Sequence, residues 1–299
     1  MSAITKTMGA APEAGERLKK ESNFTMILRR LVKNKLAVTG GIIFLFLCLI
    51  SIFAPLIAPY DWAAIDPVHK FMDPCREHLL GTDQYGRDIF SRLVYGGRWS
   101  LTLGVASTLT STILGIIVGS IAGYFGGLAD RIIMRTIDIV QCIPGMLLTI
   151  CISLALGSGV VNTVLAMSFG GIWGTARMLR GQILTVRTSE YVEAAKATNN
   201  SSFRTIIKYV LPNSIQQTII SACMGIGGSI SGISGLSFLG LGVQPPLPEW
   251  GAMLSDGRNV LRYHPNMLWA PCIMIALTIL SISFFGDGLR DAMDPRMKD

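Results

Sequence analysis

The residues best suited to chemistry lie in a polar segment, 187–212, between two long apolar stretches. Thr188 or Ser189 can cap a helix there, and the acids Glu190 and Glu193 fall in its first turn, where the helix dipole favours negative charge. A short helix with a small alanine-rich face can seat in a groove of another protein. The segment is therefore predicted to bind another protein.

The remainder of the segment predicts a break followed by a second helix. The first helix has one small face at helical spacing, formed by Tyr191, Ala194, Ala195 and Thr198. Asn199 and Asn200 interrupt this helix, and Ser201 or Ser202 can cap the next one. The second helix has an apolar face formed by Phe203, Ile206, Ile207 and Val210, and Pro212 ends it. These patterns leave two interpretations open, a docking unit and an ordinary connecting loop.

No other residues have the spacing of a catalytic or metal site. The sequence lacks an HExxH motif, a Ser/His pair and paired acids within its apolar stretches. His69, His78 and His264 lie in or beside polar loops without ligand-like spacing, and the six cysteines form no paired motif. A phosphate loop of the GxxxxGKS or GxxxxGKT type is also absent. We therefore expect no catalytic residue, no metal and no cofactor.

The composition indicates that the elements around this segment are membrane-spanning helices. The 299 residues are 50% hydrophobic and only 15% charged, with a mean hydropathy of +0.49. Soluble domains carry about 25% charged residues. The net charge of +7 is spread between apolar stretches instead of clustering on a polar domain, which excludes a nucleic-acid partner.

Uncharged windows locate the spans, because one central charge costs about 2.5–3.5 kcal/mol on insertion scales. The window 139–176 is long enough for two helices joined by a turn near residues 156–160. The remaining windows predict one helix each: 36–60, 99–129, 209–248 and 264–286. We expect an all-α membrane protein with six transmembrane helices.

The distribution of Lys and Arg predicts the orientation. Eight basic residues and three acids precede the first span, and six basic residues accompany Glu190 and Glu193 between spans four and five. Both termini and the segment 177–208 are therefore expected in the cytoplasm. Asp130, Arg131, Arg135 and Asp138 are predicted to lie on an interfacial helix. The spans themselves contain almost no ionisable residue, which disfavours an ion-coupled secondary transporter, the alternative from another class.

Glycines recur every four residues in two of the expected spans. Small residues at this interval allow helix backbones to approach closely in lipid. The contact could be within the chain or with a partner subunit, and the residues concerned are Gly115, Gly119, Gly123, Gly228 and Gly232.

Residues Glu193-Ala194-Ala195, followed by a break, Ile207 and Leu211-Pro212, resemble the EAA loop of permease subunits in bacterial binding-protein-dependent ABC importers. In that family the loop forms a coupling helix that docks on the ATPase subunit. The family usually has glycine at the position of Asn199, and asparagine tolerates the left-handed backbone that a turn there requires. The resemblance implies an ATPase-coupling loop that comprises Glu190, Tyr191, Glu193, Ala194, Ala195, Asn199, Ile207, Leu211 and Pro212.

Three further segments, 81–101, 236–251 and 286–296, are similar to the dipeptide/oligopeptide/nickel permeases, and the additional first span resembles their C-type subunit. Ile233 replaces a Glu that often precedes the LSFLG string. The resemblance implies a type I ABC importer transmembrane fold in the bacterial inner membrane. It also implies a second permease, two ATPase subunits that bind ATP and Mg²⁺, and an extracytoplasmic solute-binding protein. Peptides are the implied substrate, with nickel chelates or another small solute as alternatives.

Charged residues near the second span are expected outside the membrane. Asp88 and Arg92 have the spacing of a local ion pair, or they contribute to a surface for the binding protein or the partner permease. The candidates for that surface are Asp83, Arg87, Asp88, Arg92, Arg98 and Trp250. The predicted organisation comprises a cytoplasmic segment 1–35, a first transmembrane helix 36–58, an extracytoplasmic loop 59–98, a five-helix core 97–290 with the coupling loop 188–212, and a cytoplasmic tail 287–299.

Overall fold

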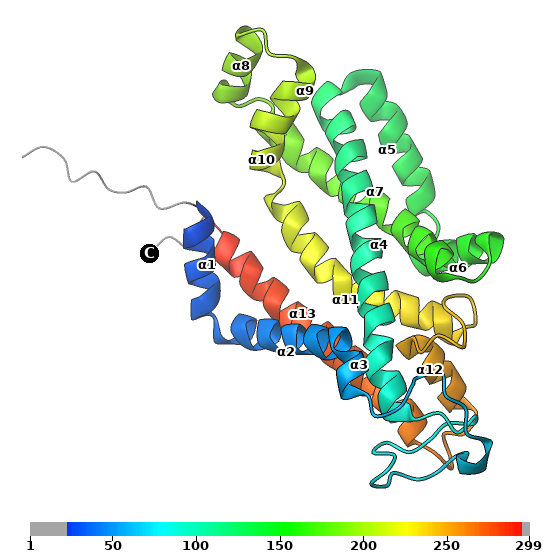
Figure 1. The fold of residues 1–299 in the computed structure, drawn as a ribbon. Helices are drawn as coiled ribbons and strands as arrows, with labels where there is room; N and C mark the ends of the chain where they lie inside the picture. The colour runs from blue at the N-terminus through cyan, green and yellow to red at the C-terminus, as the bar shows by residue number, and fades with distance from the viewer. Residues whose placement is uncertain (1–22, 295–299) are drawn as a thin grey trace, which may run out of the picture.

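The apolar stretches become helices in the computed structural model, which describes residues 23–294 (Figure 1). Within these residues there is no β-strand, and the only β-type pairing is an isolated bridge between Thr82 and Asp88. Four helices are long and apolar enough to cross a membrane: α2 (Lys35–Ile52), α4 (Ile89–Phe125), α11 (Gln216–Phe238) and α13 (Asn266–Met293). The predicted all-α membrane fold is therefore confirmed.

The region of the expected third and fourth spans differs from the prediction. A bend of 90° separates α5 (Gly127–Gln141) from α6 (Gly145–Leu156), and the pair counts as a fifth span if it is taken as one broken helix. After a turn with positive φ at Gly157 and Gly159, α7 (Val160–Val186) follows. Glycine, serine, threonine and arginine dilute the apolar character of α7, so it is not one of the candidate spans. The described residues thus contain four or five candidate spans, and the predicted count of six is not reproduced.

Charge-free windows also misplace two helix starts. The second span was expected from residue 99, but α4 begins ten residues earlier because Asp88 caps it, accepting a hydrogen bond of 2.7 Å from the Ser91 amide. The third span was expected from residue 139, but that position lies inside α5. The predicted interfacial helix with Asp130 and Asp138 is α5 itself. Hydropathy windows report where charges stop, and helices such as α4 and α5 extend beyond those limits.

Two ends of the bundle are defined by contacts between distant segments. At the first, α1 (Asn23–Lys33) meets the last residues of α13, with Arg30 Nη1 donating to the Asp294 carbonyl oxygen at 3.3 Å. The Gln216 side chain at the start of α11 also donates to the Met293 carbonyl oxygen. We call this region, together with the adjoining α8 (Glu190–Ala197), α9 (Ser202–Thr205) and α10 (Leu211–Ser214), the α8 end (Figure 1). The predicted termini at residues 1–22 and 295–299 lie outside the described residues.

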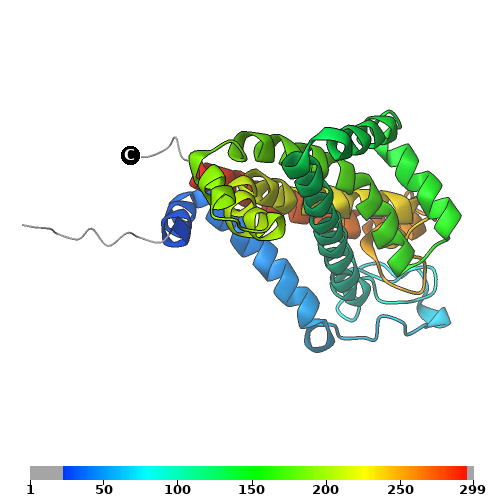
Figure 2. The same cartoon turned by 90° about the horizontal axis from the view of Figure 1, so that it is seen from above.

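The opposite end gathers the long polar loop that follows α2 and α3 (Ala54–Ile57). This loop includes η1 (Pro67–His69), and it contacts α12 (Trp250–Arg258) and the start of α13. Asn266 Nδ2 donates to the Leu80 carbonyl oxygen at 2.6 Å, and the ring of Phe71 stacks on His264. We call this region the α12 end. Seen from above, α2 lies on one side of α4, and α5 and α6 lie on the other (Figure 2).

Three of the predicted glycines bring α4 against α7. A Cβ at Gly119 would lie 2.7 Å from the carbonyl oxygen of Ala176, and one at Gly115 would lie 2.6 Å from Thr175 Cβ. At Gly123 the nearest atom would be Ile183 Cβ, at 2.8 Å. Contacts closer than about 3 Å require the helices to move apart, so these glycines serve packing within the chain.

We predict that replacing Gly119 by valine lowers the stability of the protein by about 1–3 kcal/mol, because the new side chain meets the backbone of α7. The thermal denaturation midpoint of the purified protein in detergent measures this loss. Gly228→Ala is the matched control, since a Cβ at Gly228 meets nothing within 4 Å. An unchanged midpoint for Gly119→Val would contradict the close approach of α4 and α7.

Candidate functional site

The polar segment after α7 forms a helix–break–helix unit in the structure. It consists of α8 (Glu190–Ala197), α9 (Ser202–Thr205), the π-helical turn η2 (Ile206–Val210) and α10 (Leu211–Ser214). Ser189 occupies the N-cap position of α8, although its side chain makes no capping bond. Ser201 caps α9 and accepts a hydrogen bond of 3.3 Å from the Arg204 amide.

Asn199 forms the break between the two helices in a left-handed conformation, with φ of 56°. The neighbouring Asn200 donates from Nδ2 to the Ala195 carbonyl oxygen at 2.9 Å and to Thr198 Oγ1 at 2.8 Å. The first of these bonds satisfies a carbonyl that the end of α8 leaves without a helical partner. The backbone at Asn199 is thus the one that glycine or asparagine adopts most readily.

The side of α8 that packs against the rest of the chain is not the small face that the sequence indicated. Val192 and Ala195 are buried, and Val192 packs in a cluster with Leu179 and Ile183 of α7. Of the predicted face, only Ala195 is buried, whereas Tyr191, Ala194 and Thr198 are exposed, as are Glu190 and Glu193. The helix attaches to α7 through the side that carries Val192. Three of the four side chains of the predicted small face, Tyr191, Ala194 and Thr198, therefore remain exposed.

The second helix is divided in the same way. Ile206 and Val210 are buried, but Phe203 is 75% exposed and Ile207 is 50% exposed. Large apolar side chains at this level of exposure are poorly placed in water and suit contact with another protein.

Pro212 does not end the second helix, contrary to the prediction. The backbone widens into η2, in which the Leu211 amide donates to the Ile206 carbonyl oxygen, and the helix then continues to Ser214. Proline lacks an N–H and would clash with the carbonyl four residues earlier in a regular helix. A π-turn changes the bonding pattern at that point, so the chain bends without stopping.

Ionic contacts join α7, which leads directly into α8, to its neighbours. Arg180 donates through Nε and Nη2 to the two carboxylate oxygens of Asp130 in α5, at 2.8 and 2.6 Å. Arg177 contacts Asp138, and Arg187 Nη1 donates to the Gly123 carbonyl oxygen at 2.9 Å. Such bidentate arginine–carboxylate bonds are geometrically specific. These contacts connect α7, which leads into α8, to both α4 and α5.

The residues expected to form an extracytoplasmic contact surface are mostly internal. Asp83, Arg87, Asp88, Arg92 and Trp250 are all buried, and only Arg98 is exposed. Five of these six side chains are therefore internal in this chain and do not form an exposed contact surface. Polar character in the sequence did not distinguish a buried ionic network from an exposed surface.

The buried network at the α12 end centres on Asp83. Its Oδ2 accepts a bond of 2.6 Å from Arg87 Nε and lies 3.7 Å from Arg92 Nε. Arg87 Nη2 also lies 3.4 Å from Asp256 Oδ2, and burial raises the pKa of the Asp256 carboxyl while the nearby arginines oppose that shift. The anticipated pair between Asp88 and Arg92 is replaced by a contact of 2.9 Å between Asp88 and His78.

Glu249 belongs to this end of the molecule and was missed by the sequence analysis. It is fully buried, and its carboxylate accepts bonds from Ser100 Oγ at 3.0 Å and the Ala252 amide at 2.9 Å. The adjacent Trp250 donates from Nε1 to the Leu93 carbonyl oxygen at 2.9 Å. These bonds hold α12 against α4. No local pattern could have revealed the bonds from Ser100 and to Leu93, because those partners lie about 150 residues apart, whereas the bond from Ala252 is a local helix cap.

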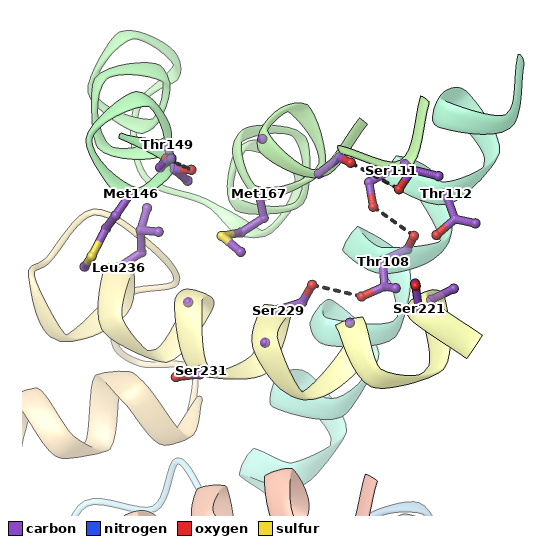
Figure 3. Close-up of a pocket in the computed structure, with 18 residues that line it drawn as sticks. Thr108, Ser111, Thr112, Met146, Thr149, Met167, Ser221, Ser229, Ser231 and Leu236 are labelled. Carbon is purple, nitrogen blue, oxygen red and sulfur yellow. Dashed lines mark hydrogen bonds between the residues drawn. The ribbon is translucent and has the colours of Figure 1, made fainter. Parts of the chain in front are cut away.

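A cavity of about 510 Å³ lies among α4, α6, α7 and α11 (Figure 3). Gly228 and Ser231 in its wall are exposed, so the cavity opens to the outside of the chain. A Cβ at Gly232 would lie 2.7 Å from the flexible Met167 side chain, whereas Gly228 faces open space. The lining includes no Asp, Glu, Lys, Arg or His. It consists of Thr108, Ser111, Thr112, Gly145, Met146, Thr149, Met167, Gly170, Gly171, Thr175, Ser221, Ala222, Gly225, Gly228, Ser229, Ser231, Gly232 and Leu236.

The serine, threonine and glycine residues of α4 and α11 were the only feature of the sequence that could have indicated this cavity. The sequence does not show which of them line the same cavity. Among the described residues, no group of three or more His, Cys, Asp or Glu side chains is placed to hold a metal ion.

An all-helical bundle with candidate spans, an uncharged cavity between its helices and an exposed helical unit at one end defines a polytopic membrane transport subunit. Residues 115–299 match the family model described as "Binding-protein-dependent transport system inner membrane component". Residues 22–74 match the "N-terminal TM domain of oligopeptide transport permease C". The chain belongs to the family of binding-protein-dependent transport system inner membrane components.

Curated relatives extend over nearly the whole chain. The dipeptide transport system permease protein DppC of Alkalihalophilus pseudofirmus is 41% identical and is aligned over 90% of this chain and 89% of its own length. The glutathione transport system permease protein GsiD of Pectobacterium atrosepticum is 40% identical, with 90% of each chain covered. The oligopeptide permease protein OppC of Bacillus subtilis is 37% identical, over 90% of this chain and 88% of its own.

Solved structures show the same fold. The inward-facing MetNI methionine ABC transporter matches with a TM-score of 0.56 and 17% identity, over 69% of this chain and 98% of the MetNI chain. The likeness confirms the predicted ABC importer transmembrane-domain fold.

Proposed function

We propose that this chain is one of two permease subunits of an ATP-driven peptide importer, with ATP hydrolysis on separate subunits. The observation that carries the proposal is the α8–α10 unit, which is anchored to α7 by Val192 and leaves Glu193, Ala194 and Phe203 exposed. An exposed helix that is rigidly joined to a spanning bundle can receive force from another protein. The family and the similarity of the EAA loop support an ATPase subunit as that protein.

Peptides are the proposed substrate because dipeptide, oligopeptide and glutathione permeases are among the curated relatives. Nickel chelates are less well supported, since the cavity has no histidine, cysteine or carboxylate in its wall. An ion-coupled secondary transporter is also disfavoured. Such proteins use ionisable residues along the pathway, and the cavity lining has none.

The α8 end is assigned to the cytoplasm, where the two ATPases bind, and the α12 end faces the binding protein. This orientation follows from the excess of Lys and Arg around α1 and in the segment 177–208. Closure of the ATPases on ATP then displaces α8. The contacts of Arg180 and Arg187 pass that displacement to the helices around the cavity. The cavity thereby alternates between the two sides of the membrane.

Reconstitution tests the proposal directly. The chain is purified with its second permease and two ATPase subunits, placed in proteoliposomes and supplied with the binding protein. We expect uptake of trialanine that requires ATP, both permeases and the binding protein. The proposal is refuted if the chain fails to co-purify with the ATPase subunits, or if complete proteoliposomes import no peptide.

A further inference from the structure

Most hydroxyl groups that line the cavity are placed to accept hydrogen bonds from a ligand and not to donate them. A serine or threonine hydroxyl has a single proton to donate but two lone pairs that accept. In helices such hydroxyls commonly donate back to a carbonyl one turn earlier. Where the proton is used in this way, only the lone pairs face the cavity.

Thr108 and Ser229 illustrate this arrangement. Thr108 Oγ1 donates to the Gly104 carbonyl oxygen at 2.9 Å, and it lies 2.8 Å from Ser229 Oγ (Figure 3). Because the single Thr108 proton is engaged, the bond between the two hydroxyls uses the proton of Ser229. The Ser229 oxygen is therefore left as an acceptor at the cavity wall.

Other hydroxyls of the lining also donate their proton to a group of the chain. Ser111 donates to the Thr108 carbonyl oxygen at 2.9 Å, and Thr149 donates to the Gly145 carbonyl oxygen at 2.9 Å. Thr175 and Ser221 likewise donate to groups of the chain itself. Six of the eight hydroxyls thus present acceptors. Within residues 23–294, Thr112 and Ser231 have no hydrogen-bond partner and remain able to donate.

We propose that the cavity is a subsite for N–H donors, namely the amide N–H groups and the N-terminal ammonium of a peptide in transit. This inference rests on the proposed function and specifies the chemistry of its pathway. An uncharged acceptor wall attracts donors without selecting the charge of side chains, and it offers little to a carboxylate. Met146, Met167 and Leu236 supply apolar surface for side chains. The volume of about 510 Å³ falls within the range of small-molecule pockets.

The first test removes one acceptor. Ser229→Ala is expected to lower trialanine uptake by the complete transporter about three- to tenfold, the effect of one lost hydrogen bond. Ser107→Ala is the matched control on the facing helix α4, because Ser107 Oγ is buried without a partner and does not line the cavity. We expect Ser107→Ala to leave uptake unchanged. Equal uptake by the wild type and Ser229→Ala would overturn the proposal.

The second test changes the charge of the wall. We expect Ser229→Asp to raise the ratio of trilysine to triglutamate uptake about tenfold relative to the wild type, and Ser229→Lys to lower it similarly. The preference of the binding protein is common to all three transporters and cancels in this comparison. A ratio unchanged in both variants, with the second permease still co-purifying, would show that the cavity does not contact peptide. Loss of ATP-dependent uptake in the wild type would instead refute the proposed function.

Discussion

Replacing Ala194 by arginine is expected to reduce ATP-dependent uptake about thirtyfold or more while the chain still folds and inserts. Ala194 is exposed on α8, so the larger side chain meets no other part of this chain. In the proposed complex it meets the ATPase subunit, where an unpaired charge at a packed interface costs upwards of about 2 kcal/mol. Uptake of trialanine in proteoliposomes measures the loss, and co-purification of the ATPase subunits shows whether docking fails.

Ala194→Ser is the control for this substitution. It adds one small polar atom at the same exposed position, and we expect uptake close to that of the wild type. The denaturation midpoint of the Ala194→Arg chain should also remain unchanged, since α8 is held through Val192 and Ala195 on its other side. Normal uptake and normal ATPase binding by Ala194→Arg would remove α8 from the coupling interface.

Replacing Asp83 by alanine is expected to destabilise the protein by about 3–5 kcal/mol, the cost of removing one partner from a buried ion pair. The carboxylate accepts bonds from the amides of Tyr85 and Arg87 as well as from Arg87 Nε. Without it, Arg87 and Arg92 become neighbouring buried cations, with Asp256 as the remaining nearby acid. The denaturation midpoint in detergent and the amount of correctly inserted protein measure this effect.

Two variants show whether charge or shape is responsible. Asp83→Asn keeps an oxygen for the backbone amides but loses the charge, so its stability should fall between those of Asp83→Ala and the wild type. Arg98→Ala should have little effect, because Arg98 is exposed and its bond of 3.2 Å to the Ile52 carbonyl oxygen is in contact with solvent. If Asp83→Ala denatured at the same temperature as the wild type, the buried network would contribute nothing to folding.

The sequence predicted the coupling loop more accurately than the location of the polar residues at the α12 end, and the difference has a physical reason. The unit around Glu190 and Asn199 is governed by local rules of capping, helical periodicity and left-handed turns, so its helices and its break could be predicted. Its buried face could not, because burial depends on where α7 lies. The local rule for proline predicted that the helix ends at Pro212. The helix continues because its backbone forms a π-turn just before this residue.

The amino-acid sequence by itself determined the class of the protein. Long uncharged stretches require helices in lipid, and the basic residues around them predict an orientation, because both effects depend on composition over a single segment. Only the tertiary structure decided which polar residues are buried at the α12 end and which hydroxyls share a cavity. Contacts such as Ser100 with Glu249 and Thr108 with Ser229 join residues more than a hundred positions apart. The packing of α4 against α7 and α11 brings such groups together, and no local pattern records that packing.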